Sequence, residues 1–176
     1  WKVNKVLFFI MLAAMTVPFQ VIMIPLVMLY GNLGLLDSKG ILIFMYMGFG
    51  VPLGVFTFHG FIKGISFELE ESSFLDGCSR VRTFFQIVFP LLKPVVVTLV
   101  VLDVLWIWND YLLPSLVLLS PANRTLPLST YAFFSSYSVD YGPLMAGLVM
   151  TIIPVLILYL VLQDYVIKGI SEGALK

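Results

Sequence analysis

Four long apolar stretches, nearly free of charged residues, constrain this chain more than any other feature of its sequence. They span residues 6–30, 41–62, 95–119 and 144–162. A helix that crosses a hydrocarbon core about 30 Å thick needs roughly 20 apolar residues, and each stretch is about that long. A secretory signal peptide has a shorter apolar core, of about 7 to 15 residues. The sequence therefore predicts an all-α, polytopic membrane helix bundle with four transmembrane helices in a single domain, residues 1–176.

The amino-acid composition also indicates that much of the protein lies in a lipid membrane. Hydrophobic residues make up 60% of the chain and charged residues 11%, whereas soluble domains carry roughly 25% charged residues. So few charges would not cover a surface that faces water. We therefore expect membrane lipid to surround much of the protein.

The sequence lacks the residues that several classes of function require. Lys and Arg balance Asp and Glu at ten each, and no basic run alternates with aromatics, so no nucleic-acid surface is predicted. One cysteine, Cys78, and one histidine, His59, do not suffice for a His/Cys metal site. The sequence also lacks the GxxxxGK[ST] phosphate-binding loop. We predict no metal and no cofactor, and any ATP that drives the protein would bind to another polypeptide.

Basic residues predict the orientation, because cytoplasmic loops accumulate Lys and Arg. With the first residues placed inside, only Lys39 and Arg124 lie outside. The basic residues on the inside are Lys2, Lys5, Lys63, Arg80, Arg82, Lys93, Lys168 and Lys176. This bias predicts that both ends of the segment are cytoplasmic and that residues 63–94 form a long cytoplasmic loop.

Within that loop, residues 66–90 predict two helices joined at a glycine. Ser66 suits a helix N-cap, and acidic side chains follow it, where the helix dipole favours negative charge. Gly77 can adopt the left-handed conformation that closes a helix. An amphipathic second helix, which Pro90 should end, is indicated by the apolar stripe of Val81, Phe84, Phe85 and Val88.

Two interpretations of this loop remain open from the residues alone. In the first, the acidic side chains are a solvated helix start, and the aromatic stripe packs against the protein's own membrane helices. In the second, the loop docks on a partner, because Phe74 and Leu75 would otherwise be exposed apolar groups.

The loop closely resembles the EAA loop of ABC transporter permeases, in the carbohydrate-uptake branch that serves binding-protein-dependent sugar importers. The family's pattern is matched at Glu71, Asp76, Gly77, Pro90 and Pro94. Ser72 and Ser73 stand where the family has alanines, and Ser66 stands where a proline is common. Serine is small enough to allow the same close approach. Residues 17–20, 24–26, 108–112 and 163–174 also look like landmarks of these permeases.

The resemblance implies a fold and a set of partners. Such permeases have six membrane helices, and this chain resembles the last four, so it looks N-terminally truncated. The implied partners are two ATP-binding cassette subunits, a second homologous permease subunit, an extracytoplasmic solute-binding protein and a sugar substrate. The implied place is the cell inner membrane, and the tail from Lys168 to Lys176 is also expected to contact the ATPase. The residues implied to couple to the ATPase are Glu70, Glu71, Ser72, Ser73, Asp76 and Gly77; Asp76 could instead cap the second helix or pair with Arg80.

The third apolar stretch contains the candidate substrate pathway. A charge at a helix centre costs roughly 2.5 to 3.5 kcal/mol on the insertion scale, so its aspartates need partners or water. On one continuous helix a single face would carry Asp103, Trp106, Ile107, Asp110 and Pro114, with Asn109 beside it. The candidate pathway residues are Asp103, Trp106, Asn109 and Asp110. Alternatively, Asp110 lies near the external interface and Asp103 bonds a neighbouring helix.

The sequence thus favours a permease subunit of an ATP-driven importer, which moves a sugar or sugar-like solute by alternating access and has no ATPase site of its own. One rival is a secondary transporter driven by an ion gradient, with Asp103 as the coupling carboxylate. Another is a structural or assembly subunit. A membrane enzyme is disfavoured, because the spans contain no paired nucleophile and base and no HExxH motif.

Overall fold

The computed structural model describes residues 2–133 and 139–174, with side chains described for residues 3–133 and 139–163. Every regular element in these ranges is a helix, which confirms the all-α class. In chain order the helices are α1 Lys2–Thr16, α2 Phe19–Asn32, α3 Lys39–Ile62, α4 Phe67–Leu75, α5 Arg80–Thr83, the π-helix η1 Phe84–Val88, α6 Phe89–Leu91, α7 Lys93–Asn109, α8 Leu112–Val117, the 3-10 helix η2 Pro121–Asn123, α9 Leu126–Thr130, the 3-10 helix η3 Tyr131–Phe133, and α10 Tyr141–Ala174.

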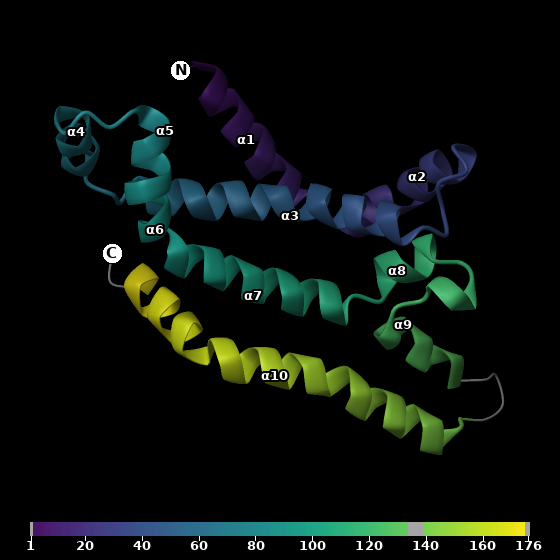
Figure 1. Ribbon diagram of the computed structural model, residues 1–176. Coiled ribbons are helices and arrows are strands. Elements are labelled where there is room, and N and C mark those ends of the chain that lie inside the picture. The colour runs from purple at the N-terminus through teal and green to yellow at the C-terminus, as the bar shows by residue number, and fades with distance from the viewer. Residues whose placement is uncertain (1, 134–138, 175–176) are drawn as a thin grey trace.

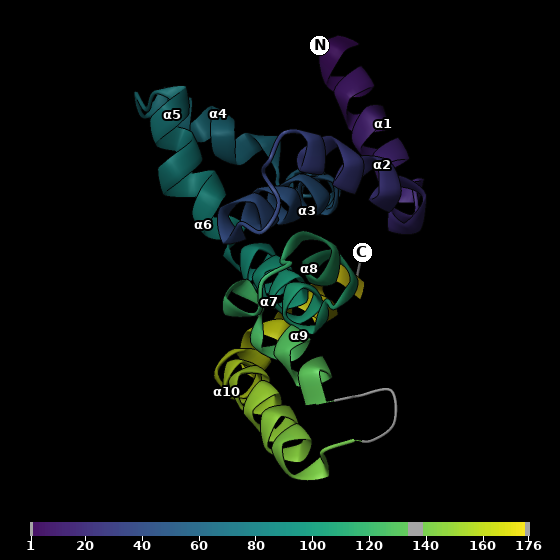
Figure 2. The same ribbon diagram turned by 90° about the vertical axis from the view of Figure 1, so that its right-hand side faces the viewer.

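Three long helices form the body of the molecule. Helix α7 packs between α3 and α10, and α1 packs against α3. Figure 1 shows α4, α5 and α6 at one end of these rods, which we call the loop end. Helices α8 and α9 lie at the opposite end, beside the α2–α3 turn, and we call residues 33–38 and 110–133 the far end. The view in Figure 2 shows α3, α7 and α10 as successive layers, with α1 leaning away.

Two helices, α3 and residues 141–163 of α10, are each long and apolar enough to cross a membrane. Two more spans exist among the described residues if each of two bent helix pairs counts as one. The first pair, α1 and α2, is bent by 98°, and the second, residues 80–91 with α7, by 65°. The predicted count of four transmembrane helices is therefore met only if each bent pair is one span, and two of the four stretches are unbroken helices of sufficient length.

The first apolar stretch is broken at Pro18. Residues 6–30 were expected to form one helix, but α1 ends at Thr16 and α2 begins at Phe19. Pro18 has ψ 136°, in the extended region. A proline disfavours the helical conformation at the residue before it and lacks the N–H that would continue the ladder. Pro25, in contrast, is accommodated inside α2.

The third apolar stretch is also interrupted, because α7 ends at Asn109 rather than running to residue 119. Asp110 is extended, with φ −72° and ψ 128°, and its Oδ1 accepts a hydrogen bond from the N–H of Leu112 at 3.0 Å. The carboxylate therefore satisfies a backbone donor at the start of α8, as helix-capping side chains do. The prediction that Asp110 and Pro114 continue the face of Asp103 was wrong for this reason.

Two small cores hold the helices together, one at each end. The far-end core joins α3, α8 and α9, and its buried residues are Leu42, Met45, Tyr46, Leu113, Val117, Leu118 and Leu128. The loop-end core joins η1, the α6–α7 junction and α7, and its buried residues are Val88, Leu92, Val95 and Leu99. Outside the cores, large apolar side chains such as Phe44 and Met47 on α3 are more than 60% exposed. Lipid or neighbouring subunits must cover that surface.

A clasp of hydrogen bonds closes the far end. Asp37 has a positive φ of 62°, and its Oδ1 accepts from the Ser120 N–H at 2.8 Å. The N–H of Asp37 donates to the Val117 carbonyl at 2.7 Å, and the amide of Asn123 donates to the Asp37 carbonyl at 2.7 Å. The clasp ties the turn between α2 and α3 to the segment that follows α8.

Candidate functional site

The loop-end helix α4 has a well-defined cap at each of its ends. The Ser66 hydroxyl accepts from the N–H of Glu68 at 3.3 Å, which confirms the predicted N-cap. At the other end Gly77 has φ 79°, as expected from the sequence. The N–H of Gly77 bonds to the Phe74 carbonyl and that of Cys78 to the Ser73 carbonyl, both at 3.0 Å. This pair of bonds is a Schellman motif, which requires a left-handed residue at the position of Gly77.

A pair of buried hydroxyls joins α4 to α5. Ser73 and Thr83 are each 2% exposed, and their hydroxyl oxygens are 2.8 Å apart. The Ser73 hydroxyl donates its one proton to the Glu70 carbonyl at 2.7 Å, so Thr83 must donate to Ser73. The serine in place of a family alanine thus makes a contact that an alanine would not make. Ser73 stabilises the corner and presents no side chain to a partner.

The second loop helix differs from the prediction in three ways. Its N-cap is Ser79, which accepts from the Arg82 N–H at 3.4 Å, rather than Asp76. Pro90 does not end it, because the helix continues through α6 to Leu91. The π-helix η1 precedes this proline, and the N–H of Phe89 bonds to the carbonyl of Phe84, five residues back. The local change from 3.6 residues per turn accommodates the proline.

The apolar stripe of this helix is divided between a core and the surface. Val88 is buried in the loop-end core, whereas Val81 and Phe85 are more than 60% exposed. Of the two interpretations left open by the sequence, packing of the stripe against the chain's own helices therefore holds for Val88 and does not hold for Val81 and Phe85. The π segment explains part of the difference, because it shifts the helical periodicity on which the stripe was predicted.

The remaining coupling candidates lie on the surface of the corner. Glu71, Ser72, Asp76 and Gly77 are exposed, and Glu70 is half-buried. The Ser72 hydroxyl donates within α4 to the Leu69 carbonyl at 3.1 Å. Leu75 is 89% exposed beside these polar groups. The corner therefore presents carboxylates and a highly exposed leucine on a helix that is capped at both ends. The tail that was predicted to contact the ATPase, residues 168–176, lies entirely outside the residues whose side chains the structure describes.

A second group of predicted residues lines a hollow between α3 and α7. Its volume is about 400 Å³, and Asp103, Trp106 and Ile107 face Tyr46 and Gly50 across it. The Trp106 ring meets the Tyr46 ring edge to face, with centroids 5.7 Å apart and planes at 82°. Hydroxyl, carboxylate and aromatic groups thus share one hollow, an arrangement that can hydrogen-bond a polyol on one side and stack against its ring on the other.

Asp110 reaches this group through Tyr46 rather than along the helix. The Tyr46 hydroxyl donates to Asp110 Oδ2 at 2.9 Å. Asn109, in contrast, bonds its own helix at the Leu105 carbonyl, 2.7 Å away, and is exposed. The structure therefore brings together three of the four predicted pathway residues and leaves Asn109 aside.

Tyr46 and Trp108 were not predicted as site residues. The Trp108 indole N–H donates to the Thr151 carbonyl at 2.9 Å, which fixes α7 to α10. A signal for Tyr46 was available, because a phenol within an otherwise apolar span needs a hydrogen-bond partner and the aspartates of the next long stretch offer one. Among the described residues, no group of three or more His, Cys, Asp or Glu side chains is placed to hold a metal ion.

Comparison with known proteins gives one family match. The model of the family described as the inner membrane component of binding-protein-dependent transport systems matches residues 1–172. A permease protein named AmyC, of a probable transport system for starch degradation products in Thermoanaerobacterium thermosulfurigenes, is 47% identical over 99% of this chain. MsmG, a permease of a multiple sugar-binding transport system in Streptococcus mutans, is 37% identical over 99% of the chain.

A third relative is MelC of Bacillus subtilis, a melibiose/raffinose/stachyose import permease, which is 35% identical over 99% of the chain. The chain spans 64% of the length of each of these three relatives. The family match covers nearly all of the chain, including the capped loop helix and the hollow between α3 and α7. This chain belongs to the family of inner-membrane permease components of binding-protein-dependent transport systems.

Proposed function

We propose that the chain is the membrane-spanning part of an importer that moves a sugar or sugar-like solute by alternating access, driven by ATP hydrolysis on partner subunits. Family membership supports this, as do the sugar-transport names of its relatives. The proposed partners are two ATP-binding cassette subunits, a second permease subunit and an extracytoplasmic solute-binding protein. We place the loop end, with both ends of the segment, in the cytoplasm, where the bias of basic residues puts it.

The observation that carries this proposal is the corner of α4. A docking element must present its contacts in one fixed geometry, because a flexible loop would absorb the motion it receives. Both ends of α4 are capped, and Leu75 projects from it with 89% of its surface exposed. Glu71 lies one helical turn before that leucine, Asp76 directly follows it, and Glu70 adds a third carboxylate on the same helix. The partner surface is thus an apolar cleft with a basic rim.

The corner is also linked to the membrane helices. The Ser73–Thr83 pair joins α4 to α5, and α5, η1 and α6 follow one another without a gap. Val88 and Leu92 at the end of this helix are buried with Val95 of α7, and Phe58 and Phe61 of α3 pack on them. A displacement of α4 would therefore reach both α3 and α7, the two helices that line the hollow.

The hollow is the proposed pathway surface. Asp103 is half-buried there and has no hydrogen-bond partner among the described residues. A carboxylate that solute hydroxyls can reach, next to the Trp106 ring, suits a polyol. Asp110 is held by Tyr46 and by the Leu112 N–H, so we assign it a positioning role at the end of this surface.

Substitutions at the corner test the coupling. In proteoliposomes that contain the assembled importer, Gly77→Pro and Glu71→Lys should each lower ATP-dependent solute uptake by about tenfold or more, the equivalent of about 1.4 kcal/mol of coupling free energy. Gly77→Asn should retain more uptake, because asparagine tolerates a positive φ. Asp140→Lys, which changes an exposed carboxylate outside the loop, is the charge control. Normal uptake by both corner variants would refute the docking role.

One observation favours the rival mechanism, a carrier coupled to an ion gradient. The Asp103 carboxylate lies in a mostly apolar hollow and has no hydrogen-bond partner among the described residues, and such carboxylates often carry protons or sodium in carriers. An ionophore that collapses the gradient separates the two mechanisms. Uptake that persists with ATP supports the importer. Uptake that stops with the gradient and is lost in Asp103→Asn supports the carrier.

A further inference from the structure

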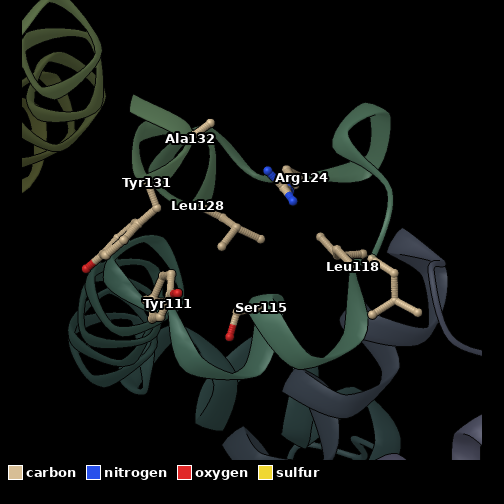
Figure 3. Close-up of a pocket in the computed structure, with 8 residues that line it drawn as sticks. Tyr111, Ser115, Leu118, Arg124, Leu128, Tyr131 and Ala132 are labelled. Carbon is tan, nitrogen blue, oxygen red and sulfur yellow. The ribbon is translucent and has the colours of Figure 1, made fainter. Parts of the chain in front are cut away.

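A second pocket lies at the far end, separate from the hollow between α3 and α7. Its volume is about 290 Å³, and it is formed by α8, α9, η3 and the segment between η2 and α9. Figure 3 shows Arg124 and Ser115 on opposite sides of it, with Leu118 and Leu128 between them on the flanks and Tyr111 and Tyr131 to one side. Neither the coupling corner nor the proposed pathway uses any of these groups.

The pocket is positively charged. Among the described residues that line it, Arg124 is the only ionisable side chain apart from the two tyrosines, and none is a carboxylate. No described residue offers its guanidinium a hydrogen bond or an ion pair. A half-buried guanidinium without an anion is costly, because it gives up hydration without gaining a partner. The pocket therefore selects an anionic ligand, and the planar fork of arginine matches the oxygens of a phosphate or a carboxylate.

The other walls are amphipathic. The Tyr111 and Tyr131 rings are stacked, with centroids 4.0 Å apart and planes at 31°. Leu118 and Leu128 are buried, whereas the neighbouring Leu119 is 59% exposed. A ligand in this pocket would thus meet an arginine at one side and apolar surface at the other. Tyrosines with one apolar and one polar end are typical of the membrane–water interface.

The position of the pocket along the membrane helices follows from its neighbours on α10 and α7. Thr130 rests on Gly147, where an added Cβ would lie 3.1 Å from the Thr130 Cγ2. Gly147 lies within the apolar span of α10, six residues after the span begins at Tyr141. Six residues of helix correspond to about 9 Å along its axis. Tyr111 follows α7 by two residues. The pocket therefore lies near the far-end termini of α7 and α10, within about 9 Å of the start of the α10 span, which is the region where lipid headgroups meet the hydrocarbon core.

We propose that this pocket binds the phosphodiester of a membrane lipid. The Arg124 guanidinium would pair with the phosphate oxygens, the tyrosine pair would face the headgroup, and the acyl chains would run along the exposed leucine and the apolar helices beside it. Basic pockets between transmembrane helices bind anionic lipid headgroups on the cytoplasmic side of other membrane proteins, and this pocket, formed by the short helices of the far end, offers an arginine to the same kind of headgroup. A carboxylate from a soluble protein would use the same arginine, but it would leave the exposed Leu119 in contact with water.

Lipid retention tests this assignment. The full-length permease is delipidated in a nonionic detergent, supplied with phosphatidylglycerol, and measured by native mass spectrometry. Arg124→Gln should weaken lipid retention by about tenfold, and Arg124→Lys should restore part of it because it keeps the charge. Lys39→Gln removes the other basic residue of the same end, exposed and outside the pocket, and should leave retention unchanged. Diacylglycerol, which has no phosphate, should bind no better to wild type than to Arg124→Gln.

A second variant keeps the arginine and fills the space. Ala132 is exposed and lines the pocket, so Ala132→Phe should displace the lipid while Arg124 and the fold remain intact. Inorganic phosphate at millimolar concentration should not compete if the lipid body contributes to binding, and full competition would reduce the site to a phosphate site. Equal retention by wild type, Arg124→Gln and Ala132→Phe would overturn the proposal. So would a photo-cross-linker at position 124 that captures the solute-binding protein in place of lipid.

Discussion

At the scale of single residues, the hydrogen bond from Tyr46 to Asp110 connects the two helices that line the hollow. It joins α3 to the junction of α7 and α8, and it leaves Trp106 packed against the same tyrosine. A carboxylate that loses a partner in a half-buried position retains the cost of its desolvation. The bond is therefore important for stability as well as for the shape of the hollow.

Replacing Tyr46 with phenylalanine removes only the hydroxyl. We expect Tyr46→Phe to lower the free energy of unfolding by about 1 to 3 kcal/mol, because the Asp110 carboxylate then loses one of its hydrogen-bond donors. Thermal unfolding in detergent micelles, followed by circular dichroism, measures this. Tyr30→Phe is the matched control, since the Tyr30 ring also packs on the far-end core and its hydroxyl has no hydrogen bond within the described residues. Equal melting temperatures for the two variants would contradict this role of the bond.

Asp37 predicts a dependence on pH at the far end. Hydrogen bonds from the Ser120 backbone N–H and hydroxyl hold the pKa of this carboxyl below its usual value of 3.8. A lowered folded-state pKa stabilises the clasp above the unfolded-state pKa, and this contribution is lost as the pH falls through the folded-state value. Hydrogen exchange at the Ser120 amide should therefore accelerate below about pH 4, after correction for the intrinsic rate.

Two substitutions at Asp37 separate charge from shape. Asp37→Asn keeps an acceptor and tolerates the positive φ of 62°, so its protection should be weaker than wild type but independent of pH in this range. Asp37→Ala loses the acceptor and also strains the backbone, so it should open the clasp at every pH. An unchanged pH profile in Asp37→Asn would show that another group titrates.

At the scale of elements, the corner between α4 and α5 depends on the Ser73–Thr83 pair. Ser73→Ala should leave the Thr83 hydroxyl buried without its acceptor and should cost about 1 to 2 kcal/mol. Adding Thr83→Val should recover part of that loss, so the double-mutant cycle should show a coupling of about 1 kcal/mol. Protection of the α4 amides from hydrogen exchange reports it. Ser72→Ala, one position away on the exposed side of α4, should have almost no effect, and strictly additive single changes would contradict the pair.

The elements also show how far sequence patterns extend. The Asp-Gly stop and the Ser66 cap depend on the local backbone, and the structure confirms both. The π-helix and its passage through Pro90 depend on packing at the α6–α7 junction, which the local sequence does not encode. The break at Pro18 could have been predicted, because a proline disfavours the helical conformation at the residue before it. The continuous apolar run around Pro18 indicated a single span instead.

The candidate sites also contain some features that the local sequence predicts and others that depend on tertiary packing. Exposure of the coupling acids followed from their position on a short polar helix. The burial of Ser73 did not, because it depends on Thr83, ten residues away. Asp103 and Trp106 share a face because they are three residues apart on one helix, whereas Asp110 joins them only through Tyr46, 64 residues away in the sequence. Contacts between distant residues of this kind need the tertiary structure.

At the scale of the whole molecule, the chain has a small core at each end and a long apolar surface between them. This division suits a permease whose two ends must move in a coordinated way while lipid and other subunits cover its middle. The loop-end core connects α4 through α5, η1 and α6 to α3 and α7. The far-end core and the Asp37 clasp hold α3, α8 and α9 together. The hollow adjoins the far-end core, because Tyr46 belongs to both.

The central claim is that the corner of α4 docks on an ATP-binding subunit, and cross-linking tests it most directly. Two single-cysteine variants, Leu75→Cys and Lys39→Cys, are made in a Cys78→Ser background. Each is assembled into the importer and treated with a short thiol-reactive cross-linker, and the adducts that the two variants form are compared. We predict that Leu75→Cys forms a covalent adduct with the ATP-binding subunit and that the yield changes when ATP is added, whereas Lys39→Cys forms none. Absence of an adduct from position 75 in an importer that still takes up solute would contradict the claim.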